Sequence, residues 1–237
     1  MKTNSHFSPN FDNKKRSIKS IVIHYTGMQS ERESLIRLCN PKYKVSSHLL
    51  INEAGDVTRL VQDNQVAWHA GKSCWGKFKN LNNNSIGIEL VNKGHRLGYS
   101  SFKKKQIISL IKICKKLIKK YKIKKINITG HSDIAPLRKI DPGEKFPWEL
   151  LSKNKIGIWH NYKINFLKKF RNIKISEKDK FQFIKKMNNI GYCVRSNERH
   201  FLKKTVKSFQ RHFRQQLING IADKECLIIA ENLAKKQ

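Results

Sequence analysis

The sequence lacks long apolar runs. No stretch of its 237 residues approaches the roughly 18 apolar residues that a membrane-spanning helix needs, so no transmembrane segment is expected. Residues 1–19 are polar and basic and lack the apolar core, about 7–15 residues long, of a secretory signal peptide. We therefore expect either a cytoplasmic protein or a mature form, in the periplasm or cell envelope, whose export signal has been removed.

Cysteines are few and irregularly placed. The five of them are odd in number, scattered along the chain and never arranged as C-x-x-C. This pattern favours neither a disulfide framework nor a thiolate zinc site. We expect free thiols, several of them in the core.

Acidic residues are also scarce. There are 17 Asp and Glu residues against 50 Lys and Arg residues, which gives a net charge of +33. Such a charge is compatible with nucleic-acid binding, but 39 of the basic residues are lysines and only 11 are arginines, the residue on which base readout mainly relies. We favour a lysine bias on solvated faces, with attraction to an acidic substrate such as the cell wall or a peptide with several carboxylates, over specific nucleic-acid binding.

Short β-rich runs alternate with helical patterns in the first 150 residues. Strands are expected over residues 20–25, 47–52, 57–61, 86–91 and 126–129, and helices over 31–39 and 102–121. The second and third strands are joined by a loop of hairpin length. This mixture predicts an α/β domain with a mixed central sheet flanked by helices.

The pattern changes towards the carboxyl terminus. No convincing strand follows residue 160, and three helical patterns appear, the first capped by Ser176 and the last by Asp223. We expect a disordered tail over 1–17, an α/β domain over 18–152 and a small three-helix bundle over 160–237.

Two polar side chains interrupt the expected buried strands. His24 shares one strand face with Val22, and a single histidine there is more often a core residue than a ligand. Glu89 is the stronger signal, because a carboxylate in an apolar strand is costly unless it is paired, bound to a metal or set in a cleft. Gly87 lies on the same face and leaves room for another group to approach.

A proline-containing loop follows the last expected strand. It begins with His131, and Lys139 and Asp141 stand two residues apart, so that in extended backbone they point to the same side. His24, His131 and Asp141 would give zinc two imidazoles and one carboxylate, with a fourth position open for water, as in hydrolytic zinc sites.

Five segments of this region form a recognisable set. They are Ile23-His-Tyr-Thr, Ser47-His-Leu-Leu-Ile-Asn, Ala67-Trp-His-Ala-Gly, Asn84-Ser-Ile-Gly-Ile-Glu, and Gly130-His-Ser-Asp-Ile-Ala-Pro followed by Lys139-Ile-Asp-Pro-Gly. In order and spacing they resemble the bacterial N-acetylmuramoyl-L-alanine amidases of the AmiD type, whose superfamily includes phage amidases and animal peptidoglycan-recognition proteins. The resemblance covers about residues 18–150.

The resemblance implies roles for individual residues. It implies that His24, His131 and Asp141 bind one zinc ion per chain, that Glu89 is the catalytic base and that Lys139 assists the reaction. The implied reaction is zinc-dependent hydrolysis of the amide bond between N-acetylmuramic acid and L-alanine in peptidoglycan or muropeptides, during cell-wall turnover or recycling.

Further residues match the family outside the catalytic set. Trp68 and His69 match a wall of the cleft and are expected to bind substrate, whereas His48 matches a histidine that is not a zinc ligand. Residues 160–237, with the core Phe209-Gln-Arg-His-Phe, resemble a three-helix peptidoglycan-binding domain that would keep the enzyme on its polymer. Cys226 stands where that domain usually has threonine, a departure expected to affect packing.

Two other functions stay open at this point. A non-catalytic peptidoglycan-recognition protein would share the fold, although such relatives usually lack part of the zinc set. A nucleic-acid-binding protein is supported by charge alone. The sequence leaves open the choice between intact wall and anhydro-muropeptides, the stem-peptide preference and the oligomeric state.

Overall fold

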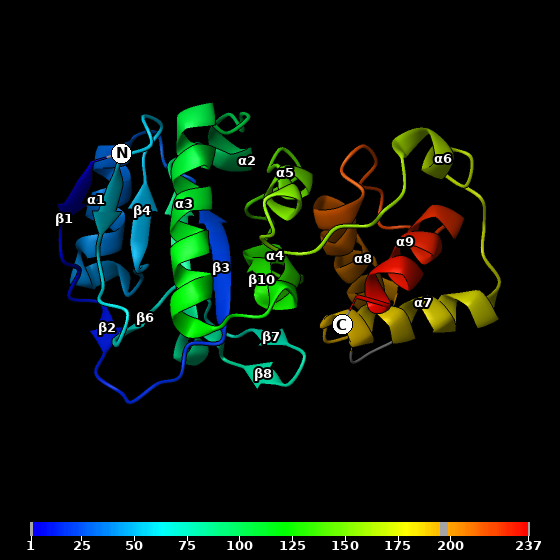
Figure 1. Cartoon of the computed structure of the whole chain (residues 1–237), viewed down its shortest axis with the longest axis horizontal. Coiled ribbons are helices and arrows are strands. Elements are labelled where there is room, and N and C mark those ends of the chain that lie inside the picture. The colour runs from blue at the N-terminus through cyan, green and yellow to red at the C-terminus, as the bar shows by residue number, and fades with distance from the viewer. Residues whose placement is uncertain (1, 195–198, 237) are drawn as a thin grey trace.

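Six strands form one mixed sheet in the amino-terminal part of the computed structural model, which describes residues 2–194 and 199–236 (Figure 1). In spatial order they are β1 (Thr3–Ser5), β5 (Val57–Arg59), β4 (Leu49–Ile51), β9 (Ser85–Leu90), β3 (Ser20–Tyr25) and β10 (Ile128–Gly130). Strands β4, β9, β3 and β10 are parallel, and β5 is antiparallel to β4. The expected mixed sheet is confirmed.

Helices cover both faces of this sheet. Helix α3 (Lys104–Tyr121) lies across one face, where Ile107, Leu110 and Leu117 pack among buried isoleucines of β3 and β9 (Figure 1). Helix α1 (Glu31–Cys39), which begins at its N-cap Ser30, packs through Leu38 against a second cluster that contains Leu50 of β4. None of the helices that the structure describes is long and apolar enough to cross a membrane.

Short elements connect these layers. They are the antiparallel pairs β2 (Phe11–Asp12) with β6 (Val66–Ala67) and β7 (Cys74–Trp75) with β8 (Phe78–Lys79), the 3-10 turns Pro41–Tyr43, Leu81–Asn84 and Lys125–Asn127, and the helices α2 (Gly94–Leu97), α4 (His131–Ile134) and α5 (Trp148–Lys153). Helix α4 follows β10 without a loop, which matters for the site described below.

The expectation of a disordered tail over residues 1–17 is wrong for the described residues. Strand β1 adds to the sheet edge in parallel with β5, and β2 pairs with β6. The guanidinium of Arg16 donates to the carbonyls of Gln65 and Ser85. Strand β1 is polar and three residues long, so it shows no apolar periodicity in the sequence. Its stability comes from backbone hydrogen bonds that β5 provides.

The carboxyl-terminal part is helical, as expected. It contains α6 (Ile164–Lys168), α7 (Glu177–Ile190), α8 (Arg199–Phe213) and α9 (Lys224–Ala234). Ser176 and Asp223 cap α7 and α9 by accepting backbone N–H bonds, which confirms both predicted caps. The last three helices lie beside the sheet-containing part rather than away from it (Figure 1).

The bundle shares a continuous core with the sheet-containing part. One cluster joins Phe183, Phe209 and Leu227 of the bundle to Trp75 and Ile134 of the preceding part. The ring of His212 also stacks on Trp148, with ring centroids 3.8 Å apart. The described residues of the range 160–237 are therefore packed against the α/β part through buried surface and are not held by a flexible linker alone.

A buried carboxylate forms the polar centre of this contact. Asp133, in α4, accepts hydrogen bonds from the Tyr192 hydroxyl (2.7 Å), the His212 Nδ1–H (2.7 Å) and the Ser208 hydroxyl (3.3 Å). It also accepts the backbone N–H of Gly130. Every member is buried, so the loss of one partner would leave a desolvated polar group.

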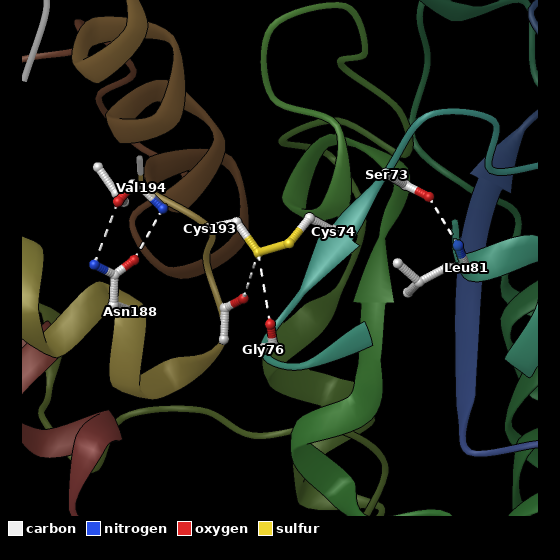
Figure 2. Close-up of a disulfide and its surroundings, with 8 residues drawn as sticks. Ser73, Cys74, Gly76, Leu81, Asn188, Cys193 and Val194 are labelled. Carbon is white, nitrogen blue, oxygen red and sulfur yellow. Dashed lines mark hydrogen bonds between the residues drawn. A yellow bond between two sulfur atoms is a disulfide. The ribbon is translucent and has the colours of Figure 1, made fainter. Parts of the chain in front are cut away.

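A disulfide also crosses the contact. Cys74 of β7 is bonded to Cys193, which follows α7, and the two Cα atoms are 6.0 Å apart (Figure 2). The expectation of five free thiols is therefore wrong for this pair, whose 119-residue separation leaves no local signal. Cys39, Cys114 and Cys226 are free, and Cys114 and Cys226 are buried as expected.

We expect the disulfide to stabilise the contact between the two parts. Reduction, or Cys193→Ser, should lower the free energy of unfolding by about 2–4 kcal/mol, because a long loop of the unfolded chain is no longer closed. Denaturant titration with and without reductant measures this, and thiol counting in denaturant should rise from three to five on reduction. The control, Cys39→Ser, should lower the free energy of unfolding by less than about 1 kcal/mol. Five reactive thiols before reduction would contradict the pairing.

Candidate active site

Three adjacent parallel strands carry the first site residues at their carboxyl ends. In the pairing of β3 with β9, His24 is directly opposite Glu89, so both side chains leave the sheet on the same face. In the pairing of β3 with β10, Gly130 is opposite Ile23, and His131 follows it as the first residue of α4. Sheet register alone thus brings His24, Glu89 and His131 together.

The loop after α4 brings in the fourth residue. Asp141 is held by a hydrogen bond from the Ser132 N–H to its carbonyl (2.8 Å). The loop can approach because residue 130 is glycine, since a Cβ there would lie 2.6 Å from Cδ of Pro142. Asp141 therefore lies beside both histidines, as the sequence predicts.

Three donor atoms converge on one point. His24 Nδ1 is 3.0 Å from His131 Nδ1 and 3.1 Å from Asp141 Oδ2, and His131 Nδ1 is 3.2 Å from the same oxygen. Tetrahedral zinc with bonds of about 2.0–2.1 Å places its ligand atoms about 3.3 Å apart. The three residues are buried and could together hold a metal ion.

The protonation of these groups fits a metal site. Burial, together with the neighbouring His131, lowers the pKa of His24 to about 4, so that its imidazole is neutral at physiological pH. Burial alone would raise the pKa of Asp141, but the neighbouring His131 and His24 hold it below its ordinary value. A neutral imidazole at His24 and an ionised carboxylate at Asp141 are ligand forms that zinc requires.

Further contacts orient both imidazoles. His131 donates its Nε2–H to the carbonyl of Ala70 (3.2 Å), which leaves the Nδ1 lone pair facing the metal position. His24 Nε2 is 3.0 Å from His69 Nδ1, and His69 Nε2 is 3.2 Å from the Ser85 hydroxyl. Such outer contacts fix the ring orientation and the tautomer of metal-bound histidines.

His69 reaches this position through Gly87. A Cβ at residue 87 would lie 2.4 Å from the His69 ring, so only glycine lets the ring lie against the sheet face that carries His24. The sequence predicts that Gly87 leaves room for another group, and that group is His69. His69 lines the cleft and also supports His24, whereas Trp68 is half-buried and is not among the described residues that line the cleft.

Glu89 faces the metal position from the neighbouring strand. Its side chain is buried, and its Oε2 has no hydrogen-bond partner among the residues that the structure describes. Burial and the nearby Asp141 raise its pKa to about 8, against the opposing effect of Lys139. A buried, unpartnered carboxylate of high proton affinity beside a metal site is suited to accept a proton from a substrate or a water molecule.

The cleft over these residues is strongly basic. It has a volume of about 550 Å³, contains the proposed metal ligands, Glu89 and Lys139, and is lined by eight lysine and arginine side chains but only two carboxylates. Three of the eight, Lys204, Lys207 and Arg211, come from α8 of the bundle. These three were not predicted from the sequence, although their spacing of three and four residues places them on one helix face.

Other histidines and buried polar groups have structural roles. His48 accepts the Gly87 N–H at Nδ1 and contacts the Gln65 carbonyl through Nε2, as a non-ligand histidine should. Asp133, two residues after His131, was not singled out from the sequence. Its only local signal is an acidic residue in the first turn of a helix, which is more often a cap than an interdomain anchor.

Comparisons with known proteins show which family the chain resembles. The sequence profile described as N-acetylmuramoyl-L-alanine amidase matches residues 14–144. The chain is 37% identical over 233 residues to N-acetylmuramoyl-L-alanine amidase AmiD of Escherichia coli, covering 92% of this chain and 83% of that protein. It is 35% identical over 162 residues to 1,6-anhydro-N-acetylmuramyl-L-alanine amidase AmpD of Haemophilus influenzae, covering 60% of this chain and 86% of that protein.

Solved structures extend the similarity to the bundle. E. coli AmiD in complex with anhydro-N-acetylmuramic acid-L-Ala-D-gamma-Glu-L-Lys aligns with a TM-score of 0.83 and 36% identity over 94% of this chain and 91% of that chain. AmpDh3 of Pseudomonas aeruginosa in complex with anhydromuramic pentapeptide aligns with a TM-score of 0.81 and 28% identity over 94% of this chain and 93% of that chain.

The contact between His24 and His69 gives a testable prediction. His69→Leu removes the group that orients His24 and should weaken binding of a divalent metal by about 10–100-fold. Competition between the apoprotein and a chelator for Zn²⁺ measures the change. His95→Leu, at the cleft margin, is the matched control and should leave the affinity unaltered; an unaltered affinity in His69→Leu would show that His69 does not support the site.

Proposed function

The chain belongs to the N-acetylmuramoyl-L-alanine amidase family, and we propose that it is a zinc-dependent enzyme that hydrolyses the amide bond between N-acetylmuramic acid and L-alanine in peptidoglycan fragments. The observation that carries this proposal is the convergence of His24, His131 and Asp141 beside the unpartnered carboxylate of Glu89. This group of residues provides both a metal site and a general base within one cleft.

Zinc is the metal that suits the donor set. Two imidazoles and one carboxylate at tetrahedral separations, with no thiolate, are the ligands of hydrolytic zinc sites. When bound, zinc supplies Lewis acidity to the reaction. The protein supplies the remaining functions, namely substrate binding, proton transfer and charge stabilisation.

Glu89 is the proposed base. It takes a proton from the attacking water and returns it to the amine of L-alanine as the amide bond breaks. Burial raises the pKa of Glu89 to about 8, and a cation held by His24, His131 and Asp141 would favour its carboxylate form, which accepts the proton. Burial without a hydrogen-bond partner leaves its Oε2 available for this transfer.

Lys139 is proposed to stabilise the negative charge that develops on the lactyl carbonyl oxygen. It lines the same cleft and lies close enough to lower the pKa of Glu89 and of His24 through its charge. A positive group near the reacting carbonyl stabilises the transition state more than the uncharged substrate.

The proposed substrate is a muropeptide. E. coli AmiD and P. aeruginosa AmpDh3 have been solved with anhydromuramic peptides. The cleft of this chain is basic, and a stem peptide carries carboxylates, so their charges are complementary. His69, which lines the cleft, supports His24 from behind, so we assign it a positioning role and propose no substrate contact for Trp68.

We propose the compartment from the disulfide. Disulfides persist in oxidising compartments and are rare in the cytosol. The Cys74–Cys193 bond therefore favours the periplasm or cell envelope over the cytoplasm. We also propose that the bundle over residues 160–237 binds peptidoglycan, as its resemblance to a peptidoglycan-binding domain implies.

The function can be tested on a defined muropeptide. Mass analysis of anhydro-N-acetylmuramic acid-L-Ala-γ-D-Glu-L-Lys after incubation should show the free tripeptide and the free sugar acid. Glu89→Gln keeps the size of the side chain but removes the proton acceptor, so turnover should fall by about 10²–10⁴-fold. Elemental analysis should find zinc retained in this variant and lost in His131→Ala. Near-normal turnover of Glu89→Gln would exclude it as the base.

Lys139→Met tests the charge at residue 139. The variant keeps the aliphatic stem and removes the ammonium, and kcat should fall by about 10²–10³-fold, the usual effect of deleting one oxyanion donor. KM should change much less, because the charge develops only in the transition state. Steady-state kinetics on the same muropeptide separates the two constants, and a change confined to KM would make Lys139 a substrate contact only.

A further inference from the structure

Helix α8 of the carboxyl-terminal bundle forms one wall of the catalytic cleft. Lys204, Lys207 and Arg211 line the same cavity as His24, Glu89 and Asp141. Their spacing places them on one face of the helix. The bundle therefore reaches the site where the amide is cut.

The position of α8 is firmly held. Ser208 and His212, on the same helix, bind Asp133 of α4, which begins with His131. The disulfide fixes the chain just before α8 to the α/β part. A helix held in this way keeps its backbone in a fixed position beside the proposed metal ligands, as a specificity site requires.

The three basic side chains are not neutralised within the protein. None of them forms an ion pair or a side-chain hydrogen bond with another residue that the structure describes. Arg211 is half-buried, and its Nε is fully buried without a partner. Glu144, the carboxylate whose charge acts most strongly on Arg211, is paired with His95 at 3.1 Å. These charges are therefore available to an anionic ligand.

The substrate has anions on one side of the scissile bond only. In a muropeptide the lactyl carboxyl is part of the amide that is cut, so an anhydro-muramic sugar carries no charge. A γ-linked D-glutamate keeps its α-carboxylate, one residue beyond L-alanine, and successive residues span about 3.3–3.6 Å each. A basic wall thus recognises the peptide, and the first anion it meets is this carboxylate.

We propose that the Lys204–Lys207–Arg211 face of α8 is a subsite for the α-carboxylate of the γ-linked glutamate, so that the bundle selects the stem peptide. This inference rests on the proposed amidase function. It assigns the bundle a role inside the cleft, in addition to any binding of the polymer.

The test compares two substrates in two variants. One substrate is anhydro-N-acetylmuramic acid-L-Ala-γ-D-Glu-L-Lys, and the other carries an α-amide on the glutamate, which keeps the shape and removes the charge. For the native protein, kcat/KM should be about ten-fold higher on the carboxylate, as expected for one charge-assisted contact in a cleft. In the double variant Lys204→Gln/Lys207→Gln this preference should fall below about two-fold.

A matched control separates local contact from net charge. Lys115→Gln/Lys116→Gln removes the same charge from exposed positions of α3 and should keep the ten-fold preference. Calorimetric binding of both ligands to these variants in a Glu89→Gln background gives the same comparison without turnover. Lys204 is exposed and Lys207 half-buried, so both should tolerate glutamine, and thermal unfolding verifies this.

The outcomes distinguish the two proposals. Cleavage with an unaltered preference in Lys204→Gln/Lys207→Gln would overturn the subsite and leave the amidase function intact. Loss of preference in both double variants would also overturn it, in favour of long-range attraction. Absence of cleavage by the native protein would refute the amidase function, and the binding comparison would then decide the subsite by itself.

Discussion

The parallel pairing of β9, β3 and β10 is the constraint on which the site depends. The register that sets His24 opposite Glu89 and Gly130 opposite Ile23 brings the proposed base and two proposed metal ligands to one sheet edge. A slip of one residue would turn His24 or Glu89 to the opposite face, where the cluster under α3 is apolar. The buried isoleucines of β3 and β9 hold the register, so core packing and catalytic geometry are determined by the same residues.

Glycine makes a crowded arrangement around that edge possible. Gly87 lets the His69 ring lie behind His24, and Gly130 lets the loop with Pro142 close over the strand end. Around the same edge, burial lowers the pKa of His24 and raises that of Glu89. The resulting neutral imidazole and strongly basic carboxylate are the forms that metal binding and proton transfer require.

The contact with the bundle extends this arrangement beyond the α/β part. Asp133 links α4, whose first residue is the proposed metal ligand His131, to Ser208 and His212 of α8. A shared apolar cluster and the disulfide hold the two parts together. As a result, the basic face of α8 is a fixed wall of the cleft, and the bundle is connected to the catalytic residues through buried contacts and not merely through the chain.

Much of this could be predicted from the sequence, because the signals are local. Alternation along residues 20–25 and 86–91 predicts the strands and the shared faces of His24 and Glu89, the stripe over residues 102–121 predicts α3, and Ser176 and Asp223 mark helix starts. The pairing of Cys74 with Cys193, the edge strand β1, and the position of α8 beside the cleft were decided only by the tertiary structure. Periodicity and caps are determined within a few residues, whereas these contacts join segments more than 50 residues apart and form only when separate faces of the chain pack together.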